Sequence, residues 1–424
     1  MTTLLILIFV IGYLGIVLEH NISIDKSSSA LLAGSLCWTV VAFISNDPHH
    51  MNEELLHHLS EIASILFFLM GAMTIVELID TYEGFDIITD KITTKSQIKL
   101  LWIICTLTFF LSAILDNLTT TIVMVTLIKK IIDKQDLRLI FVGMIVVSAN
   151  AGGAWSPMGD VTTTMLWIGG QITAGNIVKT LFLPSLVCMI IPLIAVSTTV
   201  RGFLPDKLFG DGSSKKNVGS AKYIIFFTGI GGLLFVPLFK TVTHLPPFMG
   251  MLLSLGLLWL VTELILKKKE EKFRNEYSVY RALEKVDMPS VLFFLGILLA
   301  VSALQTVGIL TDLAAWLSSA IESQTIIVTL IGLLSAIVDN VPLVAASMGM
   351  YSLEQFATDD PFWELLAYCA GTGGSALIIG SAAGVAAMGL DNIRFFWYVK
   401  KISWLALIGY FAGIGVFLLQ SMFA

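Results

Sequence analysis

Long apolar runs recur along the whole chain, and most reach the length of about 18 residues or more at which a helix can cross a bilayer. These runs are continuous, and they do not alternate with polar residues as the strands of a transmembrane β-barrel would. Hydrophobic residues make up 56% of the chain and charged residues 13%, which excludes an ordinary soluble domain. The sequence predicts an all-α polytopic membrane protein of about 10 full spans plus two hairpins. The expected spans are 2–18, 28–45, 61–80, 138–168, 177–199, 221–240, 246–266, 288–309, 363–389 and 402–423.

One seven-residue motif occurs twice. Residues 111–117 read LSAILDN and residues 334–340 read LSAIVDN, so all but one of the letters agree at an offset of 223. Each copy ends in an Asp-Asn pair between apolar stretches. A carboxylate inside an apolar segment is costly in lipid and indicates a functional site by default. Two carboxylates at matched positions, Asp116 and Asp339, predict two halves of one ion site.

The motif lies in two segments, 97–132 and 324–351, that are each long enough for two short helices with a break at the Asp-Asn pair. Two full spans or one re-entrant hairpin would both return the chain to the same side. Halves of about 15 residues are short for full spans, which favours hairpins. With hairpins, all of the 25 Lys and Arg residues except Lys179 and Lys240 fall on one side, which is then predicted to be cytoplasmic. Both termini face outward in this topology, and Lys26 lies on the cytoplasmic side.

Further matches extend the duplication. Residues 64–69 read SILFFL and residues 290–295 read SVLFFL, and the pair Gly152-Gly153 recurs as Gly373-Gly374. Hairpin one (97–132) opens to the cytoplasm in the predicted topology, and hairpin two (324–351) opens outward. The sequence therefore predicts inverted repeats of about five elements each, a plan typical of alternating-access transporters. The stretches 81–96 and 310–323 are expected to be amphipathic connectors at the two interfaces.

The Asp-Asn tips supply oxygen ligands of the kind that a hard monovalent cation prefers. Asp116 and Asp339 offer carboxylates, and each can also cap the half-helix that follows it. The alternative is that both carboxylates are structural caps only. Further oxygens at the two tips belong to Asn117, Thr119, Thr120 and Asn340.

A second polar centre interrupts the expected span 138–168. It begins at Asn150 and contains two glycines, Pro157 and Asp160 within a short stretch, which must break a helix and free backbone groups. The matching span 363–389 keeps the glycines and has Ser381 where Asp160 stands. Both spans are therefore predicted to be broken helices. The site is expected to be asymmetric, with two of its three carboxylates in the first repeat.

Glu77 lies inside the third span and is a candidate proton relay; an equally good interpretation is that its side chain extends to the interface.

With the motifs 111–120, 148–167 and 334–342 in hand, the chain resembles the NhaD-type Na⁺/H⁺ antiporters of the ion transporter superfamily over essentially its whole length. The resemblance implies a scaffold part, a mobile transport part and a homodimer formed through the scaffold. The expected division is 1–96 scaffold, 97–199 transport part of repeat one, 200–323 scaffold of repeat two, and 324–424 transport part of repeat two.

The resemblance also implies the residues that bind the cation or its competing protons. They are Asp116, Asn117, Asp160, Thr162, Asp339, Asn340, Ser375 and Ser381, and the residues of the tip and of the second polar centre add Thr119 and Asn150 to the predicted set. Of these, Na⁺ itself is expected at Asp116, Asn117, Asp160, Asp339 and Asn340. Related dicarboxylate carriers have Ser-Asn-Thr at their hairpin tips. The Asp at both tips of this chain disfavours an anionic substrate by direct repulsion.

The predicted function is export of Na⁺ or Li⁺ in exchange for H⁺ across a bacterial inner membrane. A carboxyl group taken out of water holds its proton to a higher pH, so near neutral pH the same oxygens can hold either protons or Na⁺. The cations are cargo, and no cofactor, no nucleic acid and no enzymatic activity are expected. Three alternatives stand: a sodium-coupled anion or solute carrier, an arsenite-type carrier, and an intramembrane aspartyl protease. The protease is disfavoured because the stretch before Asp160 lacks the first Gly of a Gly-x-Gly-Asp motif.

Overall fold

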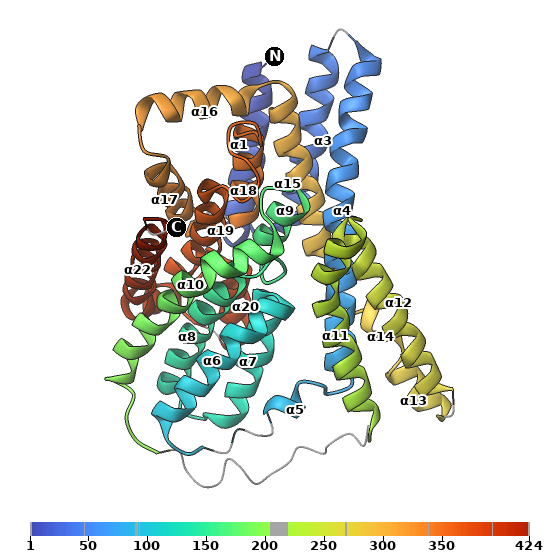
Figure 1. Cartoon of the computed structure of the whole chain (residues 1–424), viewed down its shortest axis with the longest axis vertical. Helices are drawn as coiled ribbons and strands as arrows, with labels where there is room; N and C mark the ends of the chain where they lie inside the picture. Colours follow the sequence, from blue (N-terminus) through green and yellow to red (C-terminus); the bar gives the residue numbers. More distant parts are fainter. Residues whose placement is uncertain are drawn as a thin grey trace.

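The computed structural model describes residues 2–45, 47–89, 92, 94–203, 219–267, 269–337, 339–391 and 393–422. Its described residues fold into helices and no strand, which confirms the all-α prediction (Figure 1). Of the basic residues assigned to the cytoplasmic side, Lys91, Lys207, Lys215, Lys216 and Lys268 lie outside the described residues. The main helices are α1 (Thr2–Val17), α2 (Glu19–Ile22), α3 (Lys26–Ile44), α4 (Pro48–Thr81), α5 (Asp86–Thr89), α6 (Gln97–Leu115), α7 (Asn117–Ile131), α8 (Gln135–Ala154), α9 (Val161–Ile168), α10 (Ala174–Ser197), α11 (Ala221–Thr243), α12 (Pro247–Leu266), α13 (Glu271–Glu276), α14 (Val279–Leu283), α15 (Met288–Thr306), α16 (Ile309–Ala320), α17 (Gln324–Leu334), α18 (Asn340–Met350), α19 (Pro361–Gly373), α20 (Ala382–Asp391), α21 (Phe395–Tyr398) and α22 (Trp404–Ser421).

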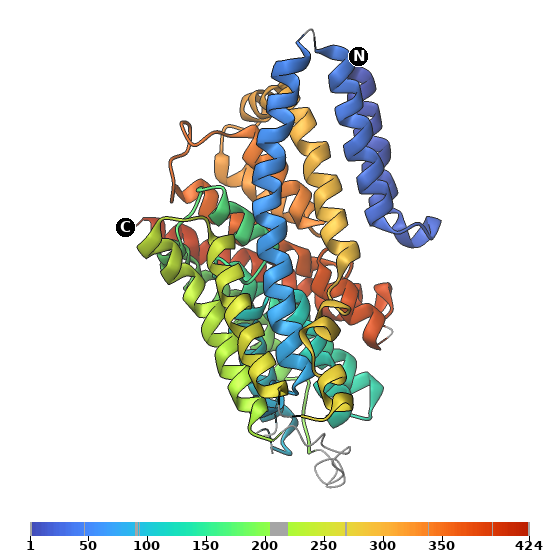
Figure 2. The same ribbon diagram turned by 90° about the vertical axis from the view of Figure 1, so that its right-hand side faces the viewer.

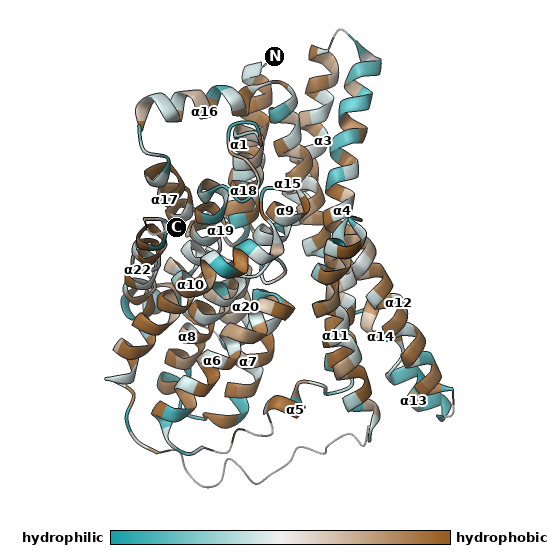
Figure 3. Ribbon diagram, in the orientation of Figure 1, coloured by the Kyte–Doolittle hydropathy of each residue, from teal (hydrophilic) through white to brown (hydrophobic). Residues whose placement is uncertain are grey.

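Nine helical stretches of the described chain are long and apolar enough to cross a membrane, or 10 if the bent pair α16–α17 counts as one span. This confirms a polytopic membrane protein. Figure 3 shows hydrophobic residues along most of α11 and α12, and hydrophilic residues at α13 and in the upper turns of α4. α1 is 16 residues long and falls below the length of a full crossing, although a span was expected there.

Both Asp-Asn pairs lie where one helix ends and the next begins. α6 and α7 meet at Asp116, and α18 begins directly after Asp339. Figure 1 shows α6 and α7 extending toward the lower end of the molecule, whereas α17 and α18 extend toward the upper end. The halves are unequal: α6 has 19 residues and α7 has 15, but α17 and α18 have 11 each. The expectation of halves of about 15 residues was therefore wrong for α6, which is long enough to span.

The two hairpins also differ in how they pack. α6 packs on both α7 and α8. In the described part of hairpin two, α17 packs chiefly on α19, and α18 packs on α15 and α16, without close packing between α17 and α18. The connector expected at 310–323 forms α16, which bends by 118° into α17 and lies across the upper end of the molecule (Figure 1). The described residues of the connector expected at 81–96 contain one short helix, the four-residue α5.

The two interrupted spans are broken where the sequence places glycine and proline. α8 ends at Ala154 and α9 begins at Val161, with Pro157 in the gap. α19 continues into a single 3₁₀ turn and stops before α20 begins at Ala382. Breaks of this kind free backbone groups that must find partners inside the protein.

The same close contacts recur at matched positions of the two halves. The Ser112 hydroxyl donates to Ala149 O at 2.5 Å, and the Ser335 hydroxyl donates to Ala370 O at 2.9 Å. A Cβ atom on Gly152 would collide with the carbonyl of Phe109, and one on Gly373 would collide with that of Gly332. Only glycine allows these helices to approach so closely.

The helices fall into two groups by their packing. In one group α3 packs on α15 and α1, and α4 packs on α12, α11 and α15. In the other, α8 packs on α6, α7, α10 and α19, and α22 packs on α10. Contacts of α15 with α18 and of α4 with α9 join the groups. Figure 2 shows the turn between α1 and α3 at about mid-height, whereas α4 continues toward the lower end.

Candidate cation site

The tip of hairpin one holds Asp116 in a conformation that ordinary residues avoid. Its φ is 97° and its ψ 160°, a region that is essentially restricted to glycine. The side chain caps α7: Oδ1 accepts from Thr119 N at 2.7 Å, and Oδ2 accepts from the Thr119 hydroxyl at 3.0 Å. Asp339 has φ −51° and ψ 135°, an ordinary extended backbone. Equivalent sequence positions thus have different backbone geometry.

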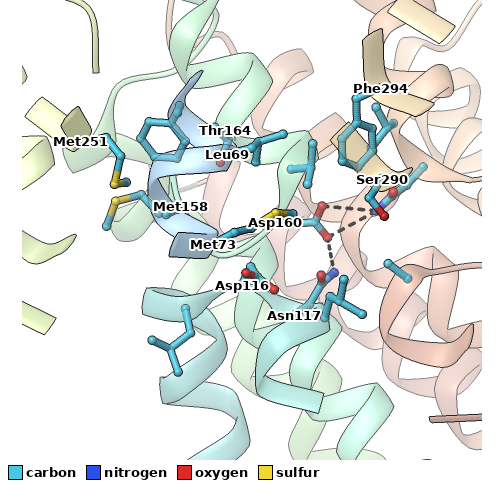
Figure 4. Close-up of a pocket in the computed structure, with 18 of the residues that line it drawn as sticks. Leu69, Met73, Asp116, Asn117, Met158, Asp160, Thr164, Met251, Ser290 and Phe294 are labelled. Carbon is cyan, nitrogen blue, oxygen red and sulfur yellow. Dashed lines mark hydrogen bonds between the residues drawn. The ribbon is translucent and has the colours of Figure 1, made fainter. Parts of the chain in front are cut away.

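Asp160 lies at the centre of the polar network and is 2% exposed. It caps α9, because Oδ1 accepts from both the amide and the hydroxyl of Thr162 at 3.0 Å. Asn117 donates to Oδ2 at 2.6 Å (Figure 4), and Asn340 donates to the same oxygen at 3.3 Å. The amides of both hairpin tips therefore converge on one buried carboxylate.

Asn150 extends this network into the second half of the chain. Its Oδ1 accepts from Asn117 at 3.1 Å, and its Nδ2 donates to the hydroxyls of Ser375 and Ser381 at 2.9 Å each. All four side chains are buried. Because both ends of the amide have partners, its orientation is determined. The structure thus connects Ser381, the counterpart of Asp160, to that carboxylate through two residues, Asn150 and Asn117.

Asp339 makes a contact that the sequence did not indicate. Its Oδ1 accepts from Val341 N at 3.3 Å, and its Oδ2 forms an ion pair with Lys26 Nζ at 3.1 Å. The prediction counted Lys26 among the basic residues of the cytoplasmic side; in the structure its side chain reaches the site from the start of α3. The reason is that the turn after the short helix α1 lies beside the hairpin tips. The one feature of the sequence that pointed to this contact was the position of a lysine between two apolar runs.

One cavity of about 50 Å³ brings the three carboxylates together. Its ionisable lining groups in the described chain are Lys26, Asp116, Asp160 and Asp339, and Asn117 and Asn340 line it too. Its apolar side is formed by α4, α11, α12 and α15; Figure 4 shows Leu69, Met73, Met251 and Phe294 around it. Such a volume holds an ion or a few waters.

Glu77 lies outside this cavity. It lines a second cavity of about 200 Å³ together with Asp80, Asp86 and Lys130, and its Oε2 is 3.7 Å from Lys285 Nζ. The two cavities approach each other at Thr119, which lines the second cavity and binds Asp116 of the first. Thr120 is buried, and its hydroxyl makes no hydrogen bond to the described chain.

Comparison with known proteins places this geometry in a family. A family model described as citrate transporter (CitMHS) matches residues 1–371. Sodium/proton antiporter 2 of Arabidopsis thaliana is 46% identical over 420 residues, 97% of this chain and 98% of the relative. Sodium/proton antiporter 1 of the same plant is 48% identical over 97% of this chain and 71% of the relative. The Na⁺/H⁺ antiporter NhaD of Alkalimonas amylolytica is 32% identical over 97% of this chain and 89% of the relative.

The chain belongs to the CitMHS family, among its NhaD-type sodium/proton antiporters. The resemblance seen in the motifs is thereby confirmed. The family model takes its description from citrate transport, whereas these full-length relatives are named for exchanging cations. In this NhaD-type chain the carboxylates at both hairpin tips accord with the second name.

Proposed function

We propose that this chain exports Na⁺, and Li⁺ by the same route, in exchange for H⁺ by alternating access. The observation that carries the proposal is the charge of the site cavity. Its ionisable lining in the described chain is three carboxylates and one lysine, hence a net charge of −2 when all are ionised. Such a cavity attracts cations and protons and repels carboxylate anions.

The same oxygens provide the coupling. Na⁺ prefers oxygen ligands, and the carboxylates of Asp116 and Asp160 line the cavity together with the side chain of Asn117, with the Thr162 hydroxyl 3.0 Å from Asp160 Oδ1. Protonation removes the negative charge that holds the metal ion. A site built in this way holds Na⁺ or protons, and one occupant leaves when the other binds.

The positions of the carboxylates favour movement of the site as a unit. Asp116, Asp160 and Asp339 each cap the N-terminal end of a half-helix, α7, α9 and α18. We propose that the transport part, residues 97–199 and 324–424, rocks against the scaffold, residues 1–96 and 200–323. Opposite openings of the two hairpins would expose the cavity to either side in turn. Inverted repeats are part of this proposal.

Glu77 is proposed as a proton relay on the side of hairpin one. The 200 Å³ cavity that it lines ends at Thr119, whose hydroxyl binds Asp116. Protons leaving Asp116 would pass to water in this cavity and then to the Glu77 carboxylate.

The decisive experiment uses purified protein in liposomes with an imposed ΔpH. Addition of NaCl or LiCl should dissipate the gradient, and KCl should not. If none of the three salts dissipates the gradient, antiport is refuted. The description of the family favours a sodium-coupled anion carrier as the second candidate. Uptake of labelled citrate driven by Na⁺ would support that candidate, and arsenite uptake would support an arsenite-type carrier.

Orientation and assembly are proposals as well. We place the protein in a bacterial inner membrane as a homodimer with both termini outside. In intact cells Lys134→Cys should react with reagents only from the cytoplasm, and Gln355→Cys only from outside; both side chains are exposed. Labelling of both from the same side would contradict the topology. Light scattering of the purified protein should give twice the chain mass of 46.2 kDa.

A further inference from the structure

Among the described residues, Lys26 is the basic residue that lines the site cavity, and its contacts are directed at the site. The ammonium lies 3.1 Å from Asp339 Oδ2 and 4.4 Å from the centroid of the Phe293 ring. The side chains of Lys26 and Asp339 are 26% and 17% exposed. Part-burial of this kind strengthens an ion pair relative to one on an open surface.

Helix formation does not explain a lysine at this position. Lys26 is the first residue of α3, where the helix dipole disfavours a positive charge. The N-terminus is already capped, because Asp25 Oδ1 accepts from Ser27 N at 2.8 Å. A basic side chain therefore weakens the start of α3 slightly, and its compensating partner is Asp339, far away in the sequence.

The ion pair between Lys26 and Asp339 occupies the carboxylate oxygen that a bound cation would need. Asp339 Oδ1 is turned toward Val341 N as a helix cap, so Oδ2 is the oxygen left for a ligand, and Lys26 holds it. Na⁺ and an ammonium group at one carboxylate oxygen repel each other. Resting on the proposed cation exchange, we infer that Lys26 is a tethered competitor, whose ammonium occupies Asp339 in the empty site and is displaced when Na⁺ binds.

The tether also joins the two groups of helices. Lys26 belongs to α3, which packs on α15 and α1, whereas Asp339 begins α18 at the tip of hairpin two. In the empty protein the ion pair ties hairpin two to α3. Na⁺ at Asp339 neutralises the carboxylate and releases Lys26, so the arriving cation removes the tie that holds the empty site in place.

The first test measures Na⁺ binding without transport. Na⁺-dependent thermal stabilisation of the detergent-purified protein gives a midpoint concentration at constant pH and ionic strength, with choline as the replacing cation. Lys26→Gln should lower this midpoint about 5-fold, the factor that corresponds to loss of one partly exposed ion pair as competitor. Lys26→Arg keeps the charge and should stay near the parental midpoint.

Lys240 supplies a matched control. Its ammonium also joins the two groups of helices, since it donates from α11 to Trp167 O in α9 at 2.8 Å, but no carboxylate is its partner in that contact. Lys240→Gln removes a tie of similar kind without removing a competitor. Its Na⁺ midpoint should remain parental.

The second test follows the released amine directly. A small amine-reactive reagent is applied to the parental protein, and modification of Lys26 is measured by mass spectrometry relative to Lys240. Added Na⁺ should increase modification of Lys26 with the same midpoint as the thermal shift, and K⁺ should not. In Asp339→Asn, Lys26 should be modified to the higher level at every Na⁺ concentration.

The outcomes separate the inference from the proposed function. A parental protein that neither exchanges nor binds Na⁺ refutes the proposed function and with it this inference. Where the parental protein exchanges Na⁺, an unchanged or raised midpoint in Lys26→Gln overturns the inference and leaves a purely structural ion pair. If Lys26→Gln does not fold, the labelling decides: modification of Lys26 that is independent of Na⁺ overturns it.

Discussion

Asn117 Nδ2 lies 2.6 Å from Asp160 Oδ2, and this hydrogen bond joins the first residue of α7 to the cap of α9. Asn340 reaches the same oxygen from hairpin two at 3.3 Å. Asp160 is thus the point where both hairpin tips meet, although it is the carboxylate without an acidic counterpart in the other half. Loss of the Asn117 or the Asn340 amide should therefore alter the surroundings of the Asp160 carboxylate, which caps a different helix.

The amide of Asn117 is therefore expected to govern Na⁺ affinity. Asn117→Ala removes its bonds to Asp160 and Asn150, a loss of about 1–3 kcal/mol for buried polar groups, or roughly 5- to 150-fold in affinity. The apparent KM for Na⁺ in proteoliposomes measures the effect. Asn176→Ala is the control, because Asn176 bonds to Glu364 away from the cavity. A parental KM in Asn117→Ala would remove this residue from the site.

Replacing the tip carboxylates should abolish exchange. Asp116→Asn and Asp339→Asn keep the side-chain volume and one carbonyl oxygen, but an amide cannot take up and release a proton. Na⁺-driven H⁺ flux should fall to the level of empty liposomes, and Asp312→Asn on the exposed face of α16 should leave it unchanged. Parental flux in Asp339→Asn would mean that this carboxylate only caps α18.

Thr162 should matter less than the carboxylates. Its hydroxyl donates to Asp160 Oδ1 at 3.0 Å, and Thr162→Ala removes this neutral group without changing the charge of the site. We expect a rise in KM for Na⁺ of roughly 5- to 150-fold with exchange retained. Thr162→Ser keeps the hydroxyl and should restore most of the affinity. Complete loss of exchange in both variants would point to a folding defect.

Protons and Na⁺ should compete. If the site holds one or the other, lowering the pH on the side where Na⁺ binds fills the oxygens with protons and raises the apparent KM for Na⁺. The maximal rate should change little over the same window, because saturating Na⁺ displaces the protons. Initial rates at several pH values and Na⁺ concentrations distinguish this pattern from a pH effect on maximal rate alone, which would indicate separate sites.

The close helix approaches at the paired glycines should be intolerant of a methyl group. A Cβ on Gly152 or Gly373 would overlap a backbone carbonyl of the neighbouring helix, so Gly152→Ala and Gly373→Ala should cost about 1–3 kcal/mol or more. Gly231→Ala is the matched control, since its Cβ would meet no other atom within 4 Å. Melting temperatures of the purified variants report the difference. Equal melting temperatures would show that the helices can separate at no cost.

Much of this site was predictable because its chemistry is local in the sequence. A carboxylate within an apolar run, or a proline between glycines inside a span, is conspicuous in any membrane protein. Asp116, Asp160 and Asp339 were found in this way, and so were the breaks after Ala154 and in the 3₁₀ turn that follows Gly373.

What was not predictable depends on where helix ends come to lie. Lys26 follows an apolar run and looks like any basic residue at a membrane surface; its contact with Asp339 exists because α1 is short. The length of α6 was also underestimated. The chain reverses at Asp116 through a backbone conformation that is typical of glycine, so an aspartate at this position gives no signal for it in the sequence.

The unequal packing of the hairpins has a mechanical consequence. α6 and α7 pack on each other and both pack on α8, so a displacement of either helix would carry the tip of hairpin one with it. α17 packs chiefly on α19, whereas α18 packs more on α15 than on α19. A displacement of α15 would therefore reach Asp339 directly through α18, without passing through α17.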